Sequence, residues 1–204
     1  METKPKSRFA KLMMATLAGT IALGGVAGTM AQAESGRKEA AAVQAMATTT
    51  LSLADAIRAA EAHSSGQVVE AEFKVKKDGA RFEVTLLDGT TEIELRIDPR
   101  TGAILATKTE ASDESPQERA AVAAAKVTLL QAISGAEAQG NKVLSAEYGH
   151  EDGTLGVELK VAGASGKVTE VMVDAATGAV MPADQDSSND ESDEGDEGGE
   201  EQEG

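Results

Sequence analysis

Hydrophobic residues recur along the chain with two different periods, and each period predicts one kind of element. A set of four residues has the i, i+3, i+4, i+7 spacing of a helix with one apolar face: Leu53, Ala56, Ile57 and Ala60. Ser52, placed three residues before Asp55, is typical of a helix N-cap. The helix should end near residues 63–66, where Gly66 suits a C-terminal cap.

After residue 66 the period changes to two, which predicts strands with one buried face. The inward positions are Val69, Ala71, Phe73 and Val75, then Phe82, Val84 and Leu86, then Ile93, Leu95 and Ile97. The sequences Asp78-Gly79 and Asp88-Gly89 mark hairpin turns between these strands. A helix followed by an antiparallel meander predicts an α+β fold, with the helix on one face of the sheet and polar residues on the other.

A short turn sequence closes this unit before a fourth strand. In residues 98–102, Asp98 can accept hydrogen bonds from backbone N–H groups two or three residues on, and Gly102 supplies a positive φ. Residues 174–178 repeat the Asp-x-x-Thr-Gly pattern, and they too are expected to lie between two strands.

The order of helix, strands and closing turn recurs at a period of about 76 residues, which predicts a duplication. We therefore expect two repeats, at residues 50–107 and 120–182, each a helix packed on an antiparallel three- to four-stranded sheet. Residues 108–119 form a charged linker in which Ser115 and Pro116 restart a helix. That helix either breaks near residues 127–128 or continues, and the alanines at 120–125 favour one long helix.

The N-terminus has the pattern of a secretory signal peptide. Residues 1–33 combine a basic start, an apolar run and the small-residue cleavage sequence Ala31-Gln32-Ala33. The alternative is an uncleaved anchor, because the apolar run is nearly long enough to span a membrane. With cleavage, we expect a periplasmic or secreted protein without stable membrane insertion. Residues 34–49 are Ala-rich and predict a linker or a frayed helix.

The chain is strongly acidic, with a net charge of −16. Removing residues 1–33 takes away four positive charges and one negative charge, which changes the net charge to −19. This charge opposes binding to nucleic acid. Residues 183–204 carry eleven Asp and Glu residues without Lys or Arg, so we expect a disordered acidic tail. Weak cation association with this tail is an alternative role, although Asn189 stands where a calcium-binding EF-hand loop needs Gly.

Candidate catalytic chemistry is sparse. The chain has no Cys, and its two histidines, His63 and His150, stand at a helix end and a strand end. It contains no zinc-peptidase, phosphate-loop, dinucleotide or serine-hydrolase motif. The sequence therefore predicts a protein that is not an enzyme, with no catalytic, cofactor-binding or metal-binding residues and no cofactor.

The sequence Ser-Leu-Ala-Asp-Ala-Ile at 52–57, the alternating strands and Ile-Asp-Pro-Arg-Thr-Gly-Ala-Ile at 97–104 resemble the PepSY domain. Residues 128–181 show a weaker resemblance to the same domain, because Gly149 and Gly156 interrupt the side-chain pattern of the strands. PepSY domains occur in propeptides of thermolysin-like metallopeptidases and in the spore protein YpeB, and they carry no catalytic residues. The resemblance implies an exported, non-catalytic protein that binds and modulates a peptidase, by inhibition or chaperoning. The alternative function is a small-ligand or calcium-sensing module that uses the acidic tail.

Overall fold

The computed structural model describes residues 28–151 and 153–181, and within them it has four helices and seven strands. The first part contains α1 (Gly28–Met46), α2 (Leu53–His63), β1 (Gln67–Lys76), β2 (Gly79–Asp88), β3 (Thr91–Ile97) and β4 (Ile104–Ala111). The second contains α3 (Pro116–Ala123), α4 (Leu129–Glu137), β5 (Lys142–Glu151), β6 (Thr154–Ala162) and β7 (Val168–Asp174).

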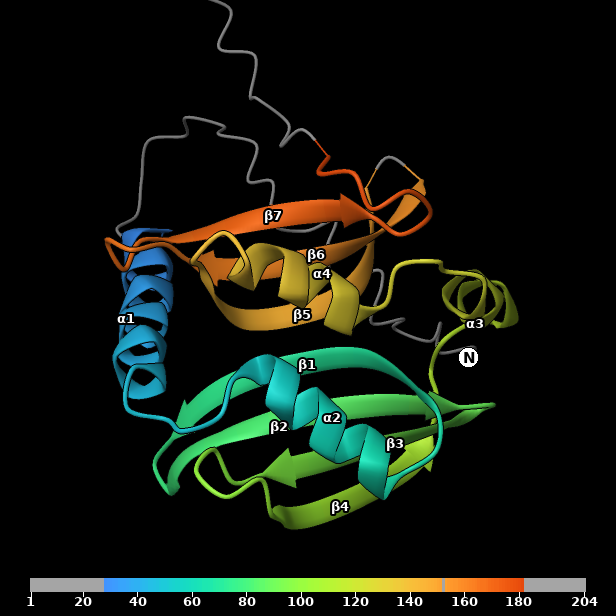
Figure 1. Ribbon diagram of the computed structural model, residues 1–204, viewed down its shortest axis with the longest axis horizontal. Coiled ribbons are helices and arrows are strands. Elements are labelled where there is room, and N and C mark those ends of the chain that lie inside the picture. The colour runs from blue at the N-terminus through green and yellow to red at the C-terminus, as the bar shows by residue number, and fades with distance from the viewer. Residues whose placement is uncertain (1–27, 152, 182–204) are drawn as a thin grey trace, which may run out of the picture.

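All seven strands belong to one antiparallel sheet with the order β4-β3-β2-β1-β5-β6-β7 (Figure 1). The α+β class is thus confirmed, but the sheet is larger than the separate three- to four-stranded sheets that we expected. The first strand of each half supplies the junction. Only three residue pairs join β1 to β5, namely Glu70–Glu147, Ala71–Ala146 and Glu72–Ser145. Ala71 and Ala146 are fully buried at its centre, so the two halves share one core.

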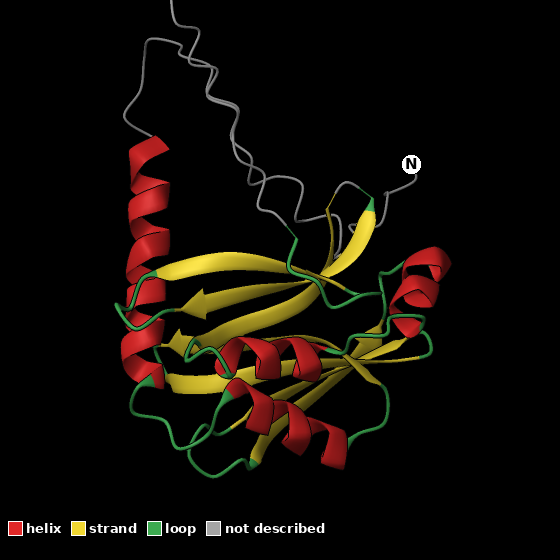
Figure 2. Cartoon of the chain, turned by 45° about the horizontal axis from the view of Figure 1, so that its top comes forward, coloured by secondary structure: helices red, strands yellow, loops and turns green. Residues whose placement is uncertain are grey.

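Helices α2 and α4 lie side by side on one face of the sheet (Figures 1 and 2). Their apolar stripes are buried there, with Leu53 and Ile57 from α2 and Leu129 and Ile133 from α4 at most 1% exposed. Helix α1 stands at one end of the sheet, where it contacts β1 and β5 and buries Met46. The helix includes most of residues 34–49, the segment that was expected to be a linker or a frayed helix.

The helix starts follow local capping chemistry. The Ser52 hydroxyl accepts a hydrogen bond from the Asp55 N–H, and the Asp55 carboxylate accepts one from the Ser52 N–H, which is the predicted N-cap. Helix α2 ends at His63 as expected, although the C-cap is Ser64 and not Gly66. Thr128 and Gln131 form the corresponding capping box of α4.

The expectation of one long helix across residues 116–137 is wrong. Helix α3 ends at Ala123, and the N–H groups of Lys126 and Val127 both donate to the carbonyl oxygen of Ala175. These bonds hold residues 126–127 in a bend, so a new helix starts at the Thr128 cap. Tertiary contacts therefore override the helix propensity of the alanines.

The strands bury most of the residues that period two predicts, but Ile93 of β3 is only partly buried while its neighbour Glu92 is 3% exposed. Phe82, Val84 and Leu86 of β2 are completely buried, whereas Val75 near the end of β1 is 42% exposed. The expected signal peptide lies mostly outside the described residues, and α1 runs through its predicted cleavage site, so cleavage stays a prediction. The acidic tail also lies outside them. Within residues 28–151 and 153–181, no helix combines the length and apolar character needed to cross a membrane.

Candidate protein-interaction surface

The two Asp-x-x-Thr-Gly turns have the same geometry. The Asp98 carboxylate accepts hydrogen bonds from the N–H groups of Arg100 and Thr101, both at 2.9 Å, and from the Thr101 hydroxyl at 3.0 Å. In the second turn, Asp174 accepts the matching bonds from Ala176 and Thr177. Each turn ends on a glycine with positive φ, 73° at Gly102 and 77° at Gly178.

These bonds determine what the two aspartates can do. Hydrogen bonds from backbone Arg100 and Thr101 lower the pKa of Asp98, and the bonds from Thr177 and Ala176 do the same for Asp174. Each carboxylate therefore stabilises the backbone of its own turn by accepting these hydrogen bonds in its ionised form. The structure places His63 on the exposed end of α2 and His150 on β5 opposite Leu155, so it does not bring the two histidines together.

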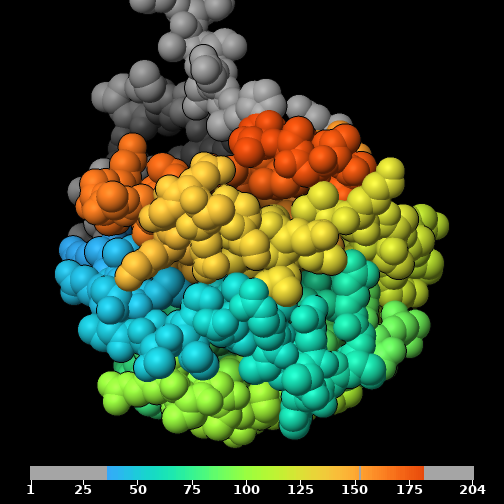
Figure 3. Space-filling model, in the orientation of Figure 1, coloured from blue at the N-terminus to red at the C-terminus, as the bar shows by residue number. Residues whose placement is uncertain are grey.

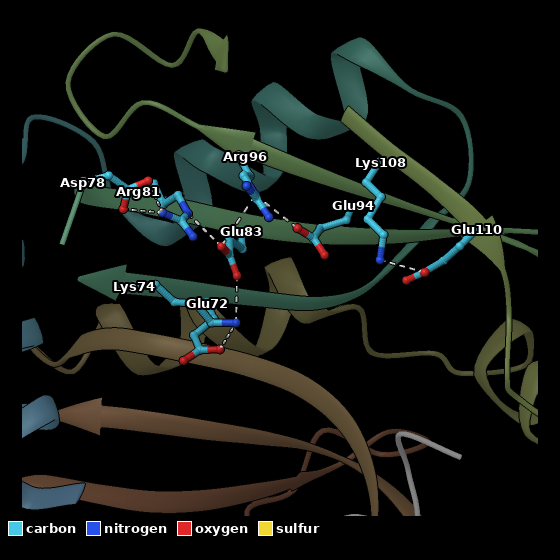
Figure 4. A network of polar contacts seen from close by, with 9 residues as sticks. All are labelled: Glu72, Lys74, Asp78, Arg81, Glu83, Glu94, Arg96, Lys108 and Glu110. Carbon is cyan, nitrogen blue, oxygen red and sulfur yellow. Dashed lines mark hydrogen bonds and ion pairs between the residues drawn. The ribbon is translucent and has the colours of Figure 1, made fainter. Parts of the chain in front are cut away.

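The face of the sheet opposite α2 carries a network of charged side chains (Figure 4). At its centre, Glu83 of β2 accepts from Arg81 at 2.7 Å and from Lys74 of β1 at 2.8 Å. Lys74 also reaches Glu72 at 2.9 Å, and Arg96 of β3 pairs with Glu94 at 3.3 Å.

The pKa values in this network show that its charges compensate one another. Burial disfavours the charged form of Glu83, but hydrogen bonds from Lys74 and Arg81 outweigh it and lower the pKa. Burial also disfavours the Lys74 ammonium, but its bonds to Glu83 and Glu72 raise its pKa well above the usual range. This half of the sheet therefore presents an ordered mosaic of both charge signs.

The polar face of the second half is different, because acidic residues outnumber their cationic partner. Glu147 of β5 lies opposite Glu70 of β1 and Glu158 of β6. Burial, followed by the charges of Glu70, Glu158 and Glu72, raises the pKa of Glu147 to about 7. Lys160 of β6 forms a salt bridge with Glu170 of β7 at 3.2 Å.

A polar bridge connects the two halves at the edge of the core. The Tyr148 hydroxyl donates to the carbonyl oxygen of Val127 at 2.9 Å, and the side-chain amide of Gln67 lies 3.3 Å from that hydroxyl. The same Gln67 amide donates to the carbonyl oxygen of Val122 in α3 at 3.0 Å. These bonds fix α3 and the segment before α4 against the start of β1.

The sheet ends in two outer strands, β4 and β7. Strand β4 pairs with β3 along its length, from Thr91–Ala111 to Ile97–Ile104. After the second turn, the described residues 179–181 form an isolated bridge between Val173 and Val180, and the rest of the expected fourth strand lies outside the described residues. Val180 is 64% exposed, while its counterpart Ile104 packs against the core.

A groove of about 510 Å³ opens beside β7. Its sheet side is formed by Leu159, Val161, Val171 and Val173, and its helix side by the small residues of α4 such as Gly135 and Ala136. Figure 3 shows this face of the molecule, with β7 in orange-red beside the yellow surface of α4. Within residues 28–151 and 153–181, no group of three or more His, Cys, Asp and Glu side chains is arranged to hold a metal ion.

The first half is thus a helix packed on an antiparallel sheet and closed by an Asp turn, with paired charges on the opposite face of the sheet. Residues 50–108 are a PepSY domain, since they match the family described as "Peptidase propeptide and YPEB domain". Domains of this family are generally non-catalytic.

A solved structure of a candidate lipoprotein from Clostridium difficile 630 is similar to this chain with 17% sequence identity and a TM-score of 0.39. The similarity covers 66% of this chain and 92% of that one. No curated protein matches the chain.

The sequence reasoning missed the β1–β5 junction and the acidic residues that meet there. Glu70 and Glu147 each occupy a polar position of an alternating strand, so their common face was visible in the pattern. Their proximity was not, because it depends on which strands of the two halves pair.

Proposed function

We propose that this is an exported, non-catalytic protein that binds a peptidase and modulates it, by inhibition or by assisting its folding. The PepSY domain at residues 50–108 carries this proposal, because the family is described by its occurrence in peptidase propeptides. The signal-like N-terminus supports export to the periplasm or the cell surroundings.

The surface chemistry supports a protein partner over a small substrate. A half-buried mosaic of paired charges gives specificity and orientation in protein recognition. Outer strands with unpaired backbone groups can accept an extended segment of a partner. The described residues of this protein offer both features.

We further infer that the domain boundaries follow a duplication, with a signal peptide at 1–33, a segment at 34–49, repeats at 50–107 and 120–182, a linker at 108–119 and an acidic tail at 183–204. The identical bonding of the two closing turns and the matching capping boxes of α2 and α4 favour this proposal. The family match covers the first half only.

The test is a direct activity and capture experiment. Purified protein is added to exported metallopeptidases of the same cell, and peptidase activity and refolding yield are measured together with co-purification. We expect capture of a peptidase and a change in one of the two readouts. A protein that captures no peptidase and changes neither activity nor refolding would refute the proposal.

A variant with Lys74→Ala and Arg81→Ala, which breaks the mosaic around Glu83, separates recognition by that face from recognition by a strand edge.

A further inference from the structure

The two closing turns lead to different structures, although the bonds inside them are the same. After the first turn, β4 covers the outer edge of β3 along its length. After the second, residues 179–181 reach only the end of β7, through the bond from the Met181 N–H to the Met172 carbonyl at 2.8 Å. Within residues 28–151 and 153–181, no longer segment pairs with the outer edge of β7.

The outward-facing backbone groups of β7 follow from this bond. In an antiparallel strand, the N–H and C=O of one residue point to the same side, and successive residues alternate. Asp174 and Met172 point outward, as their bonds to Ala179 and Met181 show. Glu170 and Val168 are next in this series, so their peptide groups face the outer edge beyond the point where the described pairing stops.

The groove next to this edge can accept side chains. Val171 and Val173 of β7 line it from the sheet, and Gly135 of α4 leaves open space within 4 Å of where a Cβ would lie. An extended segment added to β7 would direct every second side chain into this groove. Apolar or β-branched residues of moderate size fit such a site.

Charge selects among possible occupants. Glu170 precedes the Asp of its turn by four residues, as Glu94 does in the first half, and Glu94 lies opposite Lys108 of β4 in the strand register. Glu170 is 63% exposed and shares Lys160 with the neighbouring Glu158, so the edge has an excess of negative charge. A basic side chain directly opposite Glu170 would balance it.

The same charge argues against the chain's own C-terminal segment. By its distance from the turn, Asp184 corresponds to Lys108, and it would place a second carboxylate opposite Glu170. Pro182, which directly follows the last described bond, has no N–H to donate to the edge.

We propose that the outer edge of β7 and the adjoining α4 groove bind an extended segment of a partner protein with a basic residue opposite Glu170 and β-branched or apolar residues on either side. The pattern Thr107-Lys108-Thr109 of β4 is the internal example of such a segment. This inference rests on the proposed function in that it names the binding site and the chemistry of the partner segment.

The experiment uses a synthetic peptide with the sequence of β4, residues 104–111, capped at both ends. It is titrated into the isotope-labelled protein at up to millimolar concentration while backbone amide NMR signals are followed. We expect shifts at Val168–Val171 and at Gly135 of α4. A peptide with Lys108→Glu should bind more weakly, by a factor of up to about five in affinity. Methylation of the Lys108 backbone nitrogen should abolish binding, because that N–H points to the edge, whereas methylation at Thr107 should not.

Protein variants complete the test. Glu170→Lys should reverse the preference, so that the Lys108→Glu peptide binds better than the original. Glu61→Lys on the exposed face of α2 changes the net charge equally and should leave both affinities unchanged. Equal binding of the two peptides, shifts outside β7 and α4, or no shifts at all would overturn the inference. Concentration-dependent self-association with loss of the β7 signals would overturn it in favour of a second copy as the occupant.

The same variants distinguish this inference from the function on which it rests. If Glu170→Lys and the unaltered protein capture a peptidase equally, the edge inference fails while the proposed function stands. If the peptide binds as expected but no peptidase is captured, the proposed function fails and the edge remains a peptide-binding site.

Discussion

Each half of the sheet has a capped helix, a first strand with a register shift and an Asp-x-x-Thr-Gly turn. The two halves differ in their outer edge and in the charges of their polar face. In the first half, β4 completes the edge, and Lys74, Arg81 and Arg96 neutralise the acidic residues of the polar face. In the second half, the described chain pairs with the outer edge of β7 through residues 179–181, and burial raises the pKa values of Glu147 and Glu158.

This difference separates what the fold requires from what a function could use. The shared features are those that build the core: capped helices, alternating strands and the Asp-x-x-Thr-Gly turn. The features that differ lie on the surface and leave the core intact. The second half thus has the edge strand that borders an apolar groove and the polar face with raised carboxyl pKa values, which is why the inferred partner site lies there.

The largest expected effect tests whether the halves form one cooperative unit. Phe82 of β2 is completely buried, with its ring 5.2 Å from that of Phe73. Phe82→Ala should lower the free energy of unfolding by about 3–5 kcal/mol, because it leaves a cavity in the core. Urea unfolding is followed by far-UV circular dichroism and by the fluorescence of Tyr148, the only Tyr in a chain without Trp.

Because Tyr148 lies in the second half, coincident transitions would show that damage to the first half is felt across the junction. Separate transitions would contradict the single shared core. If Phe82→Ala does not fold, the milder Phe82→Leu allows the same comparison.

The second prediction uses the opposite pKa shifts of the two polar faces. The pKa of Glu147 is raised to about 7 by burial and the neighbouring acidic residues, so the folded state binds more protons than the unfolded state. Stability should therefore fall as the pH rises from about 4.5 through 7, by an amount on the order of 2 kcal/mol. Glu147→Gln should abolish this loss, as measured by urea unfolding across the pH range.

Glu83 is the control, because its pKa is lowered by Lys74 and Arg81 despite burial. Its contribution is present above the unfolded pKa and is lost as the pH falls through the folded value. Glu83→Gln should therefore reduce the acid sensitivity of the protein and leave the decline near neutral pH unchanged. An identical pH profile for the two variants would contradict the contrast between the faces.

The third prediction concerns the feature that the halves share. Gly102 and Gly178 have φ values of 73° and 77°, a region that strongly disfavours β-branched residues. Gly102→Val and Gly178→Val should each cost roughly 1–2 kcal/mol of stability, measured by thermal unfolding. An effect in one half alone would show that the turns are not equivalent.

The sequence predicts the local parts of this fold well, because their causes are local. The Ser52–Asp55 cap, the bonds of Asp98 within its turn and the burial of Phe82 all follow from spacing and residue type. The break before α4 does not, since it depends on bonds from residues 126–127 to the Ala175 carbonyl, about 50 residues away. The same limit applies to the candidate interaction surface. Its charged residues could be named from the alternating strands, but the β1–β5 pairing that brings them together is a tertiary outcome.

The smallest expected effect compares one lysine from each half. Lys108 of β4 is 57% exposed and pairs with Glu110 at 2.7 Å, so Lys108→Ala should change stability by less than about 0.5 kcal/mol. Lys160 is 37% exposed and forms the salt bridge within a group of acidic residues that includes Glu158 and Glu170. Lys160→Ala should cost more, up to about 1 kcal/mol at low salt, because it leaves like charges facing one another. The difference between the two variants should shrink as salt is added, since screening weakens the repulsion in the second half. Equal effects of the two substitutions at low salt would mean that the acidic face is compensated by cations that these contacts do not include.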